Sequence, residues 1–84
     1  MNKPHIYGIF MKARIIFGKV LRNLRREKGL TQEKLAEKAG INEKYFGELE
    51  RTNHSPTLDK VFDICNALEI ETSKFIEKIE NYPK

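Results

Sequence analysis

Apolar residues in the first third of the chain recur every three or four positions, the spacing of one face of an α-helix. Phe17, Leu21 and Leu24 form the stripe, with Val20 beside it, and Lys28 falls at the next position of the same spacing. Basic residues take the opposite face, namely Lys19, Arg22 and Arg26. Gly29 follows and is typical of a residue that ends a helix. The pattern therefore predicts a first helix over residues 12–28.

Two short helices are predicted next, with a tight turn between them. Thr31 can cap the first, which we expect over Gln32–Ala39. Gly40 ends that helix, and Asn42 can cap the second. The second runs to about Arg51 and turns two apolar residues inward, Phe46 and Leu49. Two short helices joined by a turn that begins with glycine are the pattern of a helix-turn-helix.

Two further helices follow a polar loop over residues 52–56. The fourth, Leu58–Leu68, is expected to turn one side inward, consisting of Leu58, Val61, Ile64, Cys65 and Leu68. The fifth begins near Thr72 or Ser73 and carries Phe75, Ile76 and Ile79. No strand pattern and no repeat interrupts this series. We therefore expect an all-α fold of five helices, with the helix-turn-helix at the second and third.

The length of 84 residues leaves room for a single domain. Pro4 and Gly8 are poor residues for a helix, so we expect residues 1–11 to be an N-terminal arm and residues 12–84 to be the domain. Lys12 and Arg14 interrupt a faint signal-peptide pattern, and no apolar run reaches the length of a membrane span. We therefore expect a cytoplasmic protein.

The net charge of +4 is unevenly distributed. Eight Lys or Arg against one acid give +7 in residues 1–30, whereas residues 31–50 carry −2 and residues 51–84 carry −1. A basic segment of this kind favours a polyanionic partner such as DNA. A lone Cys65 with two distant histidines has no metal-ligand spacing, and no catalytic grouping or effector pocket is evident. We expect no cofactor and no enzyme.

From Phe17 to Ile76 the chain resembles the repressor-type helix-turn-helix family, also called Xre-type, which includes the phage λ and 434 repressors. The stretches that carry the resemblance are Phe17-Gly18, Leu21-Arg22-x-Leu24-Arg25, Gly29-Leu30-Thr31-Gln32-Glu33-Lys34-Leu35-Ala36, Ala39-Gly40-Ile41, Tyr45-Phe46-Gly47-Glu48-Leu49-Glu50-Arg51, Pro56-Thr57-Leu58 and Ile64-Cys65-Asn66-Ala67-Leu68. The compact length and the charged final helix resemble restriction-modification controller proteins, which are small dimeric regulators. Thr52 and Glu69 depart from the family by standing where glycine is common.

The resemblance implies which residues contact DNA. Gln32, next to the cap Thr31, would hold a phosphate with its side chain and the helix N-terminus. The positions that would read base edges are Asn42, Glu43, Lys44 and Glu48, whose side chains have suitable donors and acceptors. Two alternatives stay open: Glu43 near the helix start can merely complement the helix dipole, and Lys44 can pair with Glu48 at i, i+4.

Other positions have both a DNA-contacting and a structural interpretation. Tyr45 can reach the DNA with its hydroxyl or simply pack against the core. Gly47 in mid-helix suggests a close approach, although it can equally be neutral. The loop that straddles the DNA backbone in the family corresponds here to Arg51, Asn53, His54 and Ser55, which can otherwise be merely solvated.

Two further sets of residues are expected to build the structure. Arg25 and Glu50 match the family's buried ion pair, which links the first helix to the third. Apolar residues in the last two helices exceed what so small a core needs, and we expect them to form an isologous dimer interface with Phe62, Phe75, Ile76 and Ile79.

The sequence thus predicts a homodimeric transcriptional regulator that binds a near-palindromic operator in duplex DNA, presenting its third helix to two major grooves about 34 Å apart. An alternative is a protein-interaction module, such as an antitoxin or an adaptor, which the acids Glu43 and Glu48 favour. An enzyme is the third and weakest reading, because no catalytic motif is present.

Overall fold

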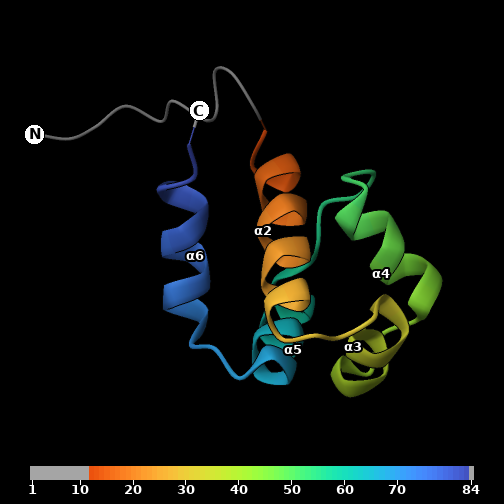
Figure 1. Ribbon diagram of the computed structural model, residues 1–84. Coiled ribbons are helices and arrows are strands. Elements are labelled where there is room, and N and C mark those ends of the chain that lie inside the picture. The colour runs from red at the N-terminus through yellow and green to blue at the C-terminus, as the bar shows by residue number, and fades with distance from the viewer. Residues whose placement is uncertain (1–11, 84) are drawn as a thin grey trace, which may run out of the picture.

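The computed structural model describes residues 12–83, which form five α-helices and no strand (Figure 1). The helices are α2 (Ala13–Glu27), α3 (Gln32–Ala39), α4 (Glu43–Glu50), α5 (Leu58–Leu68) and α6 (Thr72–Glu80). The all-α prediction is confirmed, with the helix-turn-helix at α3 and α4. The predicted arm over residues 1–11 lies outside the described residues, as does Lys84.

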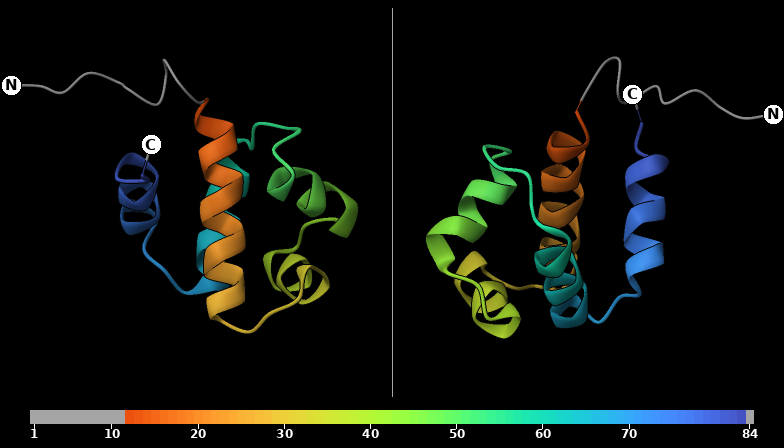
Figure 2. Two further views of the ribbon diagram at one scale, coloured as in Figure 1. Left: turned by 45° about the horizontal axis from the view of Figure 1, so that its top comes forward. Right: turned by 180° about the vertical axis from the view of Figure 1, so that it is seen from behind.

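Helix α2 stands at the centre of the arrangement (Figures 1 and 2). α6 packs along one side of it, and α4 packs against it on the other side. α5 contacts both α3 and α6, so the chain after the helix-turn-helix passes behind α2 to reach α6. α3 and α4 consequently form a corner at one end of the molecule.

The core draws buried residues from all five helices. α2 contributes its predicted stripe of Phe17, Val20, Leu21 and Leu24, together with Ile16. The Phe17 and Phe75 rings stack at a tilt, with centroids 5.3 Å apart, and so join α2 to α6. Two predicted inward positions are wrong: Lys28 is exposed because α2 ends at Glu27, and Leu58 is 71% exposed at the first turn of α5.

Side-chain caps fix the corner between α3 and α4, as predicted. The backbone N–H of Lys34 donates to the Thr31 hydroxyl at 3.0 Å, and that of Tyr45 donates to Asn42 Oδ1 at 3.1 Å. Between the caps, Gly40 has φ 70°, a left-handed conformation that glycine adopts without a side-chain clash. The corner therefore depends on two cap hydrogen bonds and one glycine conformation, all at positions that the sequence identifies.

Two residues that carry a side chain, unlike glycine, also adopt left-handed backbone conformations. Thr52 has φ 68° and Glu69 has φ 59°. These are the two positions where the chain departs from the glycine that the family often has. The backbone keeps the glycine-like geometry at both sites, and each residue bears a cost of about 1 kcal/mol or more. Thr52 and Glu69 therefore keep the backbone path of the two loops but lower the stability of the protein.

Helix α2 approaches the end of α4 most closely at Gly18. A Cβ atom added there would lie 2.5 Å from the Leu49 carbonyl oxygen and 3.1 Å from that of Glu50. Both neighbours are backbone atoms at the end of α4, which cannot move aside cheaply. The missing side chain of Gly18 therefore sets the distance between α2 and α4.

We predict that Gly18→Ala destabilises the protein by about 1–3 kcal/mol, because the added methyl group must push α4 away from α2. Gly47→Ala is the matched control, since its Cβ would meet side-chain atoms and no backbone, namely Arg51 Nη1 at 3.3 Å and Gln32 Oε1 at 3.4 Å. Alanine should leave stability there unchanged or raise it by up to about 1 kcal/mol. Urea denaturation followed by circular dichroism measures both, and equal effects would contradict the close approach.

Candidate nucleic-acid interface

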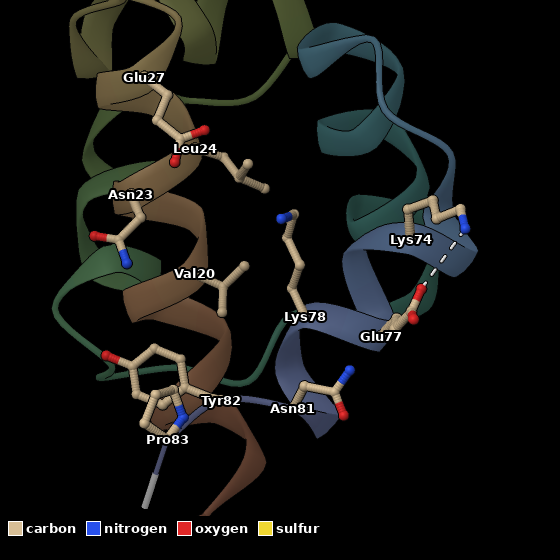
Figure 3. A pocket seen from close by; sticks show the side chains of 10 residues that line it. All are labelled: Val20, Asn23, Leu24, Glu27, Lys74, Glu77, Lys78, Asn81, Tyr82 and Pro83. Carbon is tan, nitrogen blue, oxygen red and sulfur yellow. Dashed lines mark ion pairs between the residues drawn. The ribbon is translucent and has the colours of Figure 1, made fainter.

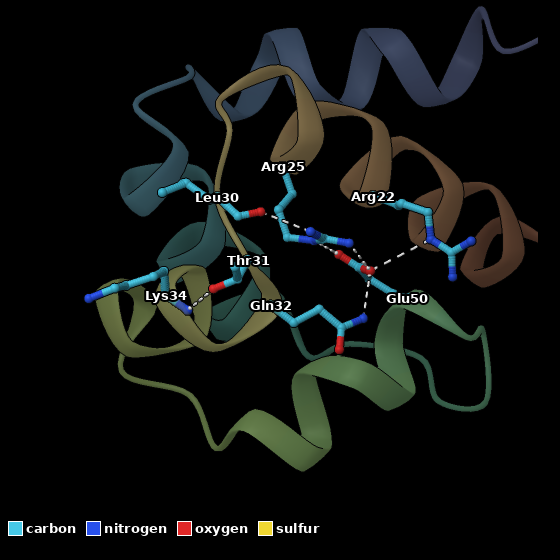
Figure 4. A network of polar contacts seen from close by, with 7 residues as sticks. All are labelled: Arg22, Arg25, Leu30, Thr31, Gln32, Lys34 and Glu50. Atoms are coloured by element: carbon cyan, nitrogen blue, oxygen red, sulfur yellow. Dashed lines mark hydrogen bonds and ion pairs between the residues drawn. The ribbon is translucent and has the colours of Figure 1, made fainter.

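The carboxylate of Glu50, at the end of α4, is completely buried and is surrounded by donors (Figure 4). Arg25 Nε donates to Oε2 at 2.6 Å and Arg25 Nη2 donates to Oε1 at 3.0 Å, so the expected ion pair is bidentate. Arg25 Nη1 also donates to the Leu30 carbonyl at 2.8 Å. The hydrogen bond to Glu50 raises the pKa of Arg25, despite the opposing effect of its burial. Both charges are therefore held inside the protein with their polar atoms satisfied.

Two more side chains converge on the same carboxylate. Gln32 Nε2 donates to Glu50 Oε1 at 2.8 Å, and Arg22 Nε lies 3.7 Å from that oxygen. Arg22 was predicted on the outer face of its helix, but its side chain is only 41% exposed and turns toward Glu50. The attraction of a buried carboxylate explains the difference. Glu50 thus connects α2, the start of α3 and the end of α4.

Gln32 therefore has a partner within the protein, Glu50, in addition to the DNA phosphate that we expect it to bind. The bond to Glu50 uses one hydrogen of its side-chain amide, and the residue is half-buried. The second amide hydrogen and the first backbone N–H groups of α3 have no partner inside the helix and suit an anion. The network fixes Gln32 at the position where such an anion would bind.

The predicted base-reading face is open at the start of α4. Asn42, Glu43 and Lys44 are exposed. A shallow hollow lies beside them and is lined by Gln32, Glu43, Lys44, Gly47 and Arg51. The expected outer position of Gly47 needs correction, because Gly47 is buried beneath the side chains of Gln32 and Arg51. Because Gly47 has no side chain, the Arg51 side chain of the same protein can lie close against it.

Tyr45 lies between the core and the surface, so both expected roles stay compatible with its position. It is half-buried and packs against the core cluster. Its ring also lies 5.9 Å from the His54 ring, measured between centroids. Tyr45 thereby links α4 to the loop that follows it.

The Glu48 side chain binds residues of the same loop. Its carboxylate accepts a hydrogen bond from Asn53 Nδ2 at 3.1 Å and lies 3.5 Å from Arg51 Nη2 and 3.6 Å from His54 Nε2. The hydrogen bond from Asn53, aided by the nearby Arg51, His54 and Lys44, lowers the pKa of Glu48, so the group is ionised at neutral pH. The ion-pair partner of Glu48 is therefore Arg51, directly after α4, and the pair with Lys44 that the i, i+4 spacing allowed does not form.

The four residues expected at a dimer interface divide into two pairs. Phe75 and Ile79 are buried in the core of the single chain, at 0% and 8% exposure. Phe62 and Ile76 are exposed, at 49% and 41%. The first pair already has partners in its own chain, so an apolar contact surface on α5 and α6 is left to the second pair, together with the exposed Leu58.

A second hollow lies on the opposite side of α2 from Glu50, between α2 and α6 (Figure 3). Val20 and Leu24 form its apolar floor, and Lys78 extends into it. Lys74 and Glu77 form an ion pair at its rim, 3.7 Å apart. No residue predicted to contact DNA lines this hollow, so it is separate from the candidate interface.

The described residues offer no other chemistry of note. Within residues 12–83, no three His, Cys, Asp or Glu side chains gather in a way that could hold a metal ion. Burial raises the pKa of the Cys65 thiol, which keeps it protonated at neutral pH. In the same range, none of the helices combines the length and the apolar character needed to cross a bilayer.

Three contacts at this site were missed from the sequence. Gln32 bonds Glu50, Asn53 bonds Glu48, and Arg14 Nε donates to the Thr52 carbonyl at 3.1 Å. All three join residues from different elements, or from a helix and the loop that follows it. Helical spacing carries no signal for such contacts, because the first depends on how α3 and α4 are oriented and the other two on how the loop after α4 turns.

Comparison with known proteins supports one family. The family model described as "Helix-turn-helix" matches residues 21–75. An uncharacterised HTH-type transcriptional regulator of Sinorhizobium fredii, y4dJ, is 32% identical over 73 residues, which are 87% of this chain and 95% of that protein. Control protein C.SmaI of Serratia marcescens is 30% identical over 69 residues, 82% of each chain. The crystal structure of the restriction-modification controller protein C.AhdI of Aeromonas hydrophila has a TM-score of 0.72 and 37% identity, covering 74% of this chain and 94% of that one.

We predict that Arg25→Met lowers the free energy of unfolding by about 3–5 kcal/mol, because it strands the buried Glu50 charge. Adding Glu50→Leu should recover most of the loss, since no buried charge then remains. Arg26→Met is the control: Arg26 is exposed one residue further along α2, and its loss should cost no more than about 0.5 kcal/mol. Urea titrations compare the variants, and similar costs for Arg25→Met and Arg26→Met would contradict the role of the network.

Proposed function

The chain belongs to the helix-turn-helix family of DNA-binding transcriptional regulators, and from this premise we propose that it acts as a homodimer on a near-palindromic operator. The observation that carries the proposal is the exposed start of α4, held at a fixed angle to α3 by the Glu50 network. A rigid helix end with exposed polar side chains suits the major groove. Such a regulator would work in the cytoplasm, where the DNA of its bacterial relatives lies.

The contacts with DNA divide into base-reading and backbone-positioning ones. Lys44 and Asn42 are exposed at the start of α4 and would approach base edges, with Glu43 beside them. Lysine can donate to guanine O6 or N7, and the amide of Asn42 can donate to a base while its Oδ1 caps the helix. Backbone contacts would come from Thr31 and Gln32 at the start of α3 and from the loop residues Arg51, Asn53 and His54.

The proposed dimer places two copies of α4 on one side of the assembly. Its support is the exposure of Phe62 and Ile76 on the two helices that follow the helix-turn-helix. Leu58 lies one helical turn before Phe62 and is also exposed, so these two extend one apolar strip along α5. An isologous interface built on such a strip would give the DNA-binding unit twofold symmetry.

The relatives favour a narrower role. Two of the three similar proteins are named as a control protein and a restriction-modification controller protein, and this chain covers 82% and 94% of their lengths. We therefore place the chain near regulators that consist of little more than the helix-turn-helix domain. Whether it activates or represses would follow from the location of its operator.

We predict that purified protein enriches one inverted-repeat sequence from random duplex DNA. Lys44→Ala should relax the preference at one position of each half-site, at a cost of about 1–3 kcal/mol for the original operator. Lys38→Ala is the control, because Lys38 is an exposed lysine at the far end of α3 and its loss should leave the preference unchanged. Enrichment of no sequence by the unaltered protein would contradict the proposed function.

We also predict that Phe62→Glu combined with Ile76→Glu raises the dimer dissociation constant by about tenfold or more, because two charges would be buried at the interface. Ser73→Glu adds a charge at an exposed polar position of α6 and should leave the constant unchanged. Sedimentation equilibrium measures all three proteins. A wild-type protein that stays monomeric at tens of micromolar would contradict the dimer.

A further inference from the structure

Glu48 gathers the side chains that would otherwise contact the DNA backbone. Its carboxylate holds Asn53, Arg51 and His54 at 3.1, 3.5 and 3.6 Å, measured from the donor nitrogen to the nearer oxygen. An amide, a guanidinium and an imidazole are the kinds of donor that proteins offer to phosphate oxygens. In the free protein, these donors surround a carboxylate of the protein itself.

The backbone of the loop explains why this contact forms. After α4, Thr52 takes its left-handed conformation and the Asn53 N–H donates to the Glu48 carbonyl at 3.0 Å. The chain is thereby folded back along the last turn of α4, which brings Asn53 and His54 beside the Glu48 side chain. The ring contact between Tyr45 and His54 holds the loop from the other side.

Resting on the proposed function, we infer that the Glu48 carboxylate takes the place of a DNA phosphate in the free protein and competes with DNA for Arg51, Asn53 and His54. Glu48 is then an affinity-determining residue and not a reader of bases. Because phosphates are the same at every sequence, its effect is felt by operator and random duplex alike.

The solvent exposure of these side chains allows a DNA phosphate to replace the Glu48 carboxylate. The side chain of Glu48 is 23% exposed, whereas those of Arg51 and His54 are both 54% exposed. Ion pairs this accessible to water are weak, so a phosphate can displace the carboxylate. The competition therefore lowers the affinity for DNA without preventing binding. Its effect is largest at low salt, where both the internal and the external attraction are strongest.

The test compares Glu48→Gln with Glu43→Gln. Both remove one negative charge from α4, but Glu43 is exposed and forms no ion pair among the described residues. We expect Glu48→Gln to raise the affinity for the selected operator and for a random duplex by a similar factor, on the order of threefold to tenfold at low salt. The slope of log K against log salt should steepen by about one, and Glu43→Gln should give a clearly smaller gain.

A second comparison tests whether the gain in affinity acts through Arg51. In an Arg51→Gln background, Glu48→Gln should gain much less affinity than it does alone, because the main donor that it frees is already absent. Circular dichroism confirms that each variant is folded.

Three results would overturn the inference: equal gains for the two glutamate variants, an unchanged gain in the Arg51→Gln background, or a loss of affinity confined to the operator, which would make Glu48 a base reader. A wild-type protein that binds no duplex would contradict the proposed function itself.

Discussion

A single buried carboxylate holds the DNA-binding corner together. The Glu50 side chain has no exposure to water, and a buried carboxylate is tolerable only because each of its oxygens is paired with a donor. Its partners come from α2 and from the first residue of α3, and Glu50 itself ends α4. The three helices are therefore fixed relative to each other by one set of directional bonds, whereas apolar packing alone would allow them to slide.

The same network separates a rigid part of the interface from an adaptable part. Gln32 is tied to Glu50 and cannot move without breaking the core network. Arg51, in contrast, lies over Gly47 and beside Glu48 with more than half of its side chain exposed. If DNA binds here as proposed, such a surface would combine a fixed register at α3 with a cation that can adjust to the DNA backbone.

The sequence predicted what depends on neighbouring residues and missed what depends on distant ones. Helix bounds, the caps Thr31 and Asn42, and the turn at Gly40 follow from local chemistry and agree with the structure. The family resemblance supplied the Arg25–Glu50 pair. Helical spacing could not tell that Phe75 is buried within its own chain while Ile76 is exposed, because both lie near one apolar stripe. Nor could it place the loop after α4, whose path depends on the left-handed backbone at Thr52.

The outward side chains of Glu43 and Lys44 at the start of α4 contribute almost nothing to folding. Glu43 and Lys44 face solvent, and the cap at Asn42 needs only a short side-chain oxygen. Replacing the two outer side chains therefore has little thermodynamic penalty. A scaffold of this design lets recognition and stability vary independently, so that near-identical folds can serve promoters of unrelated sequence.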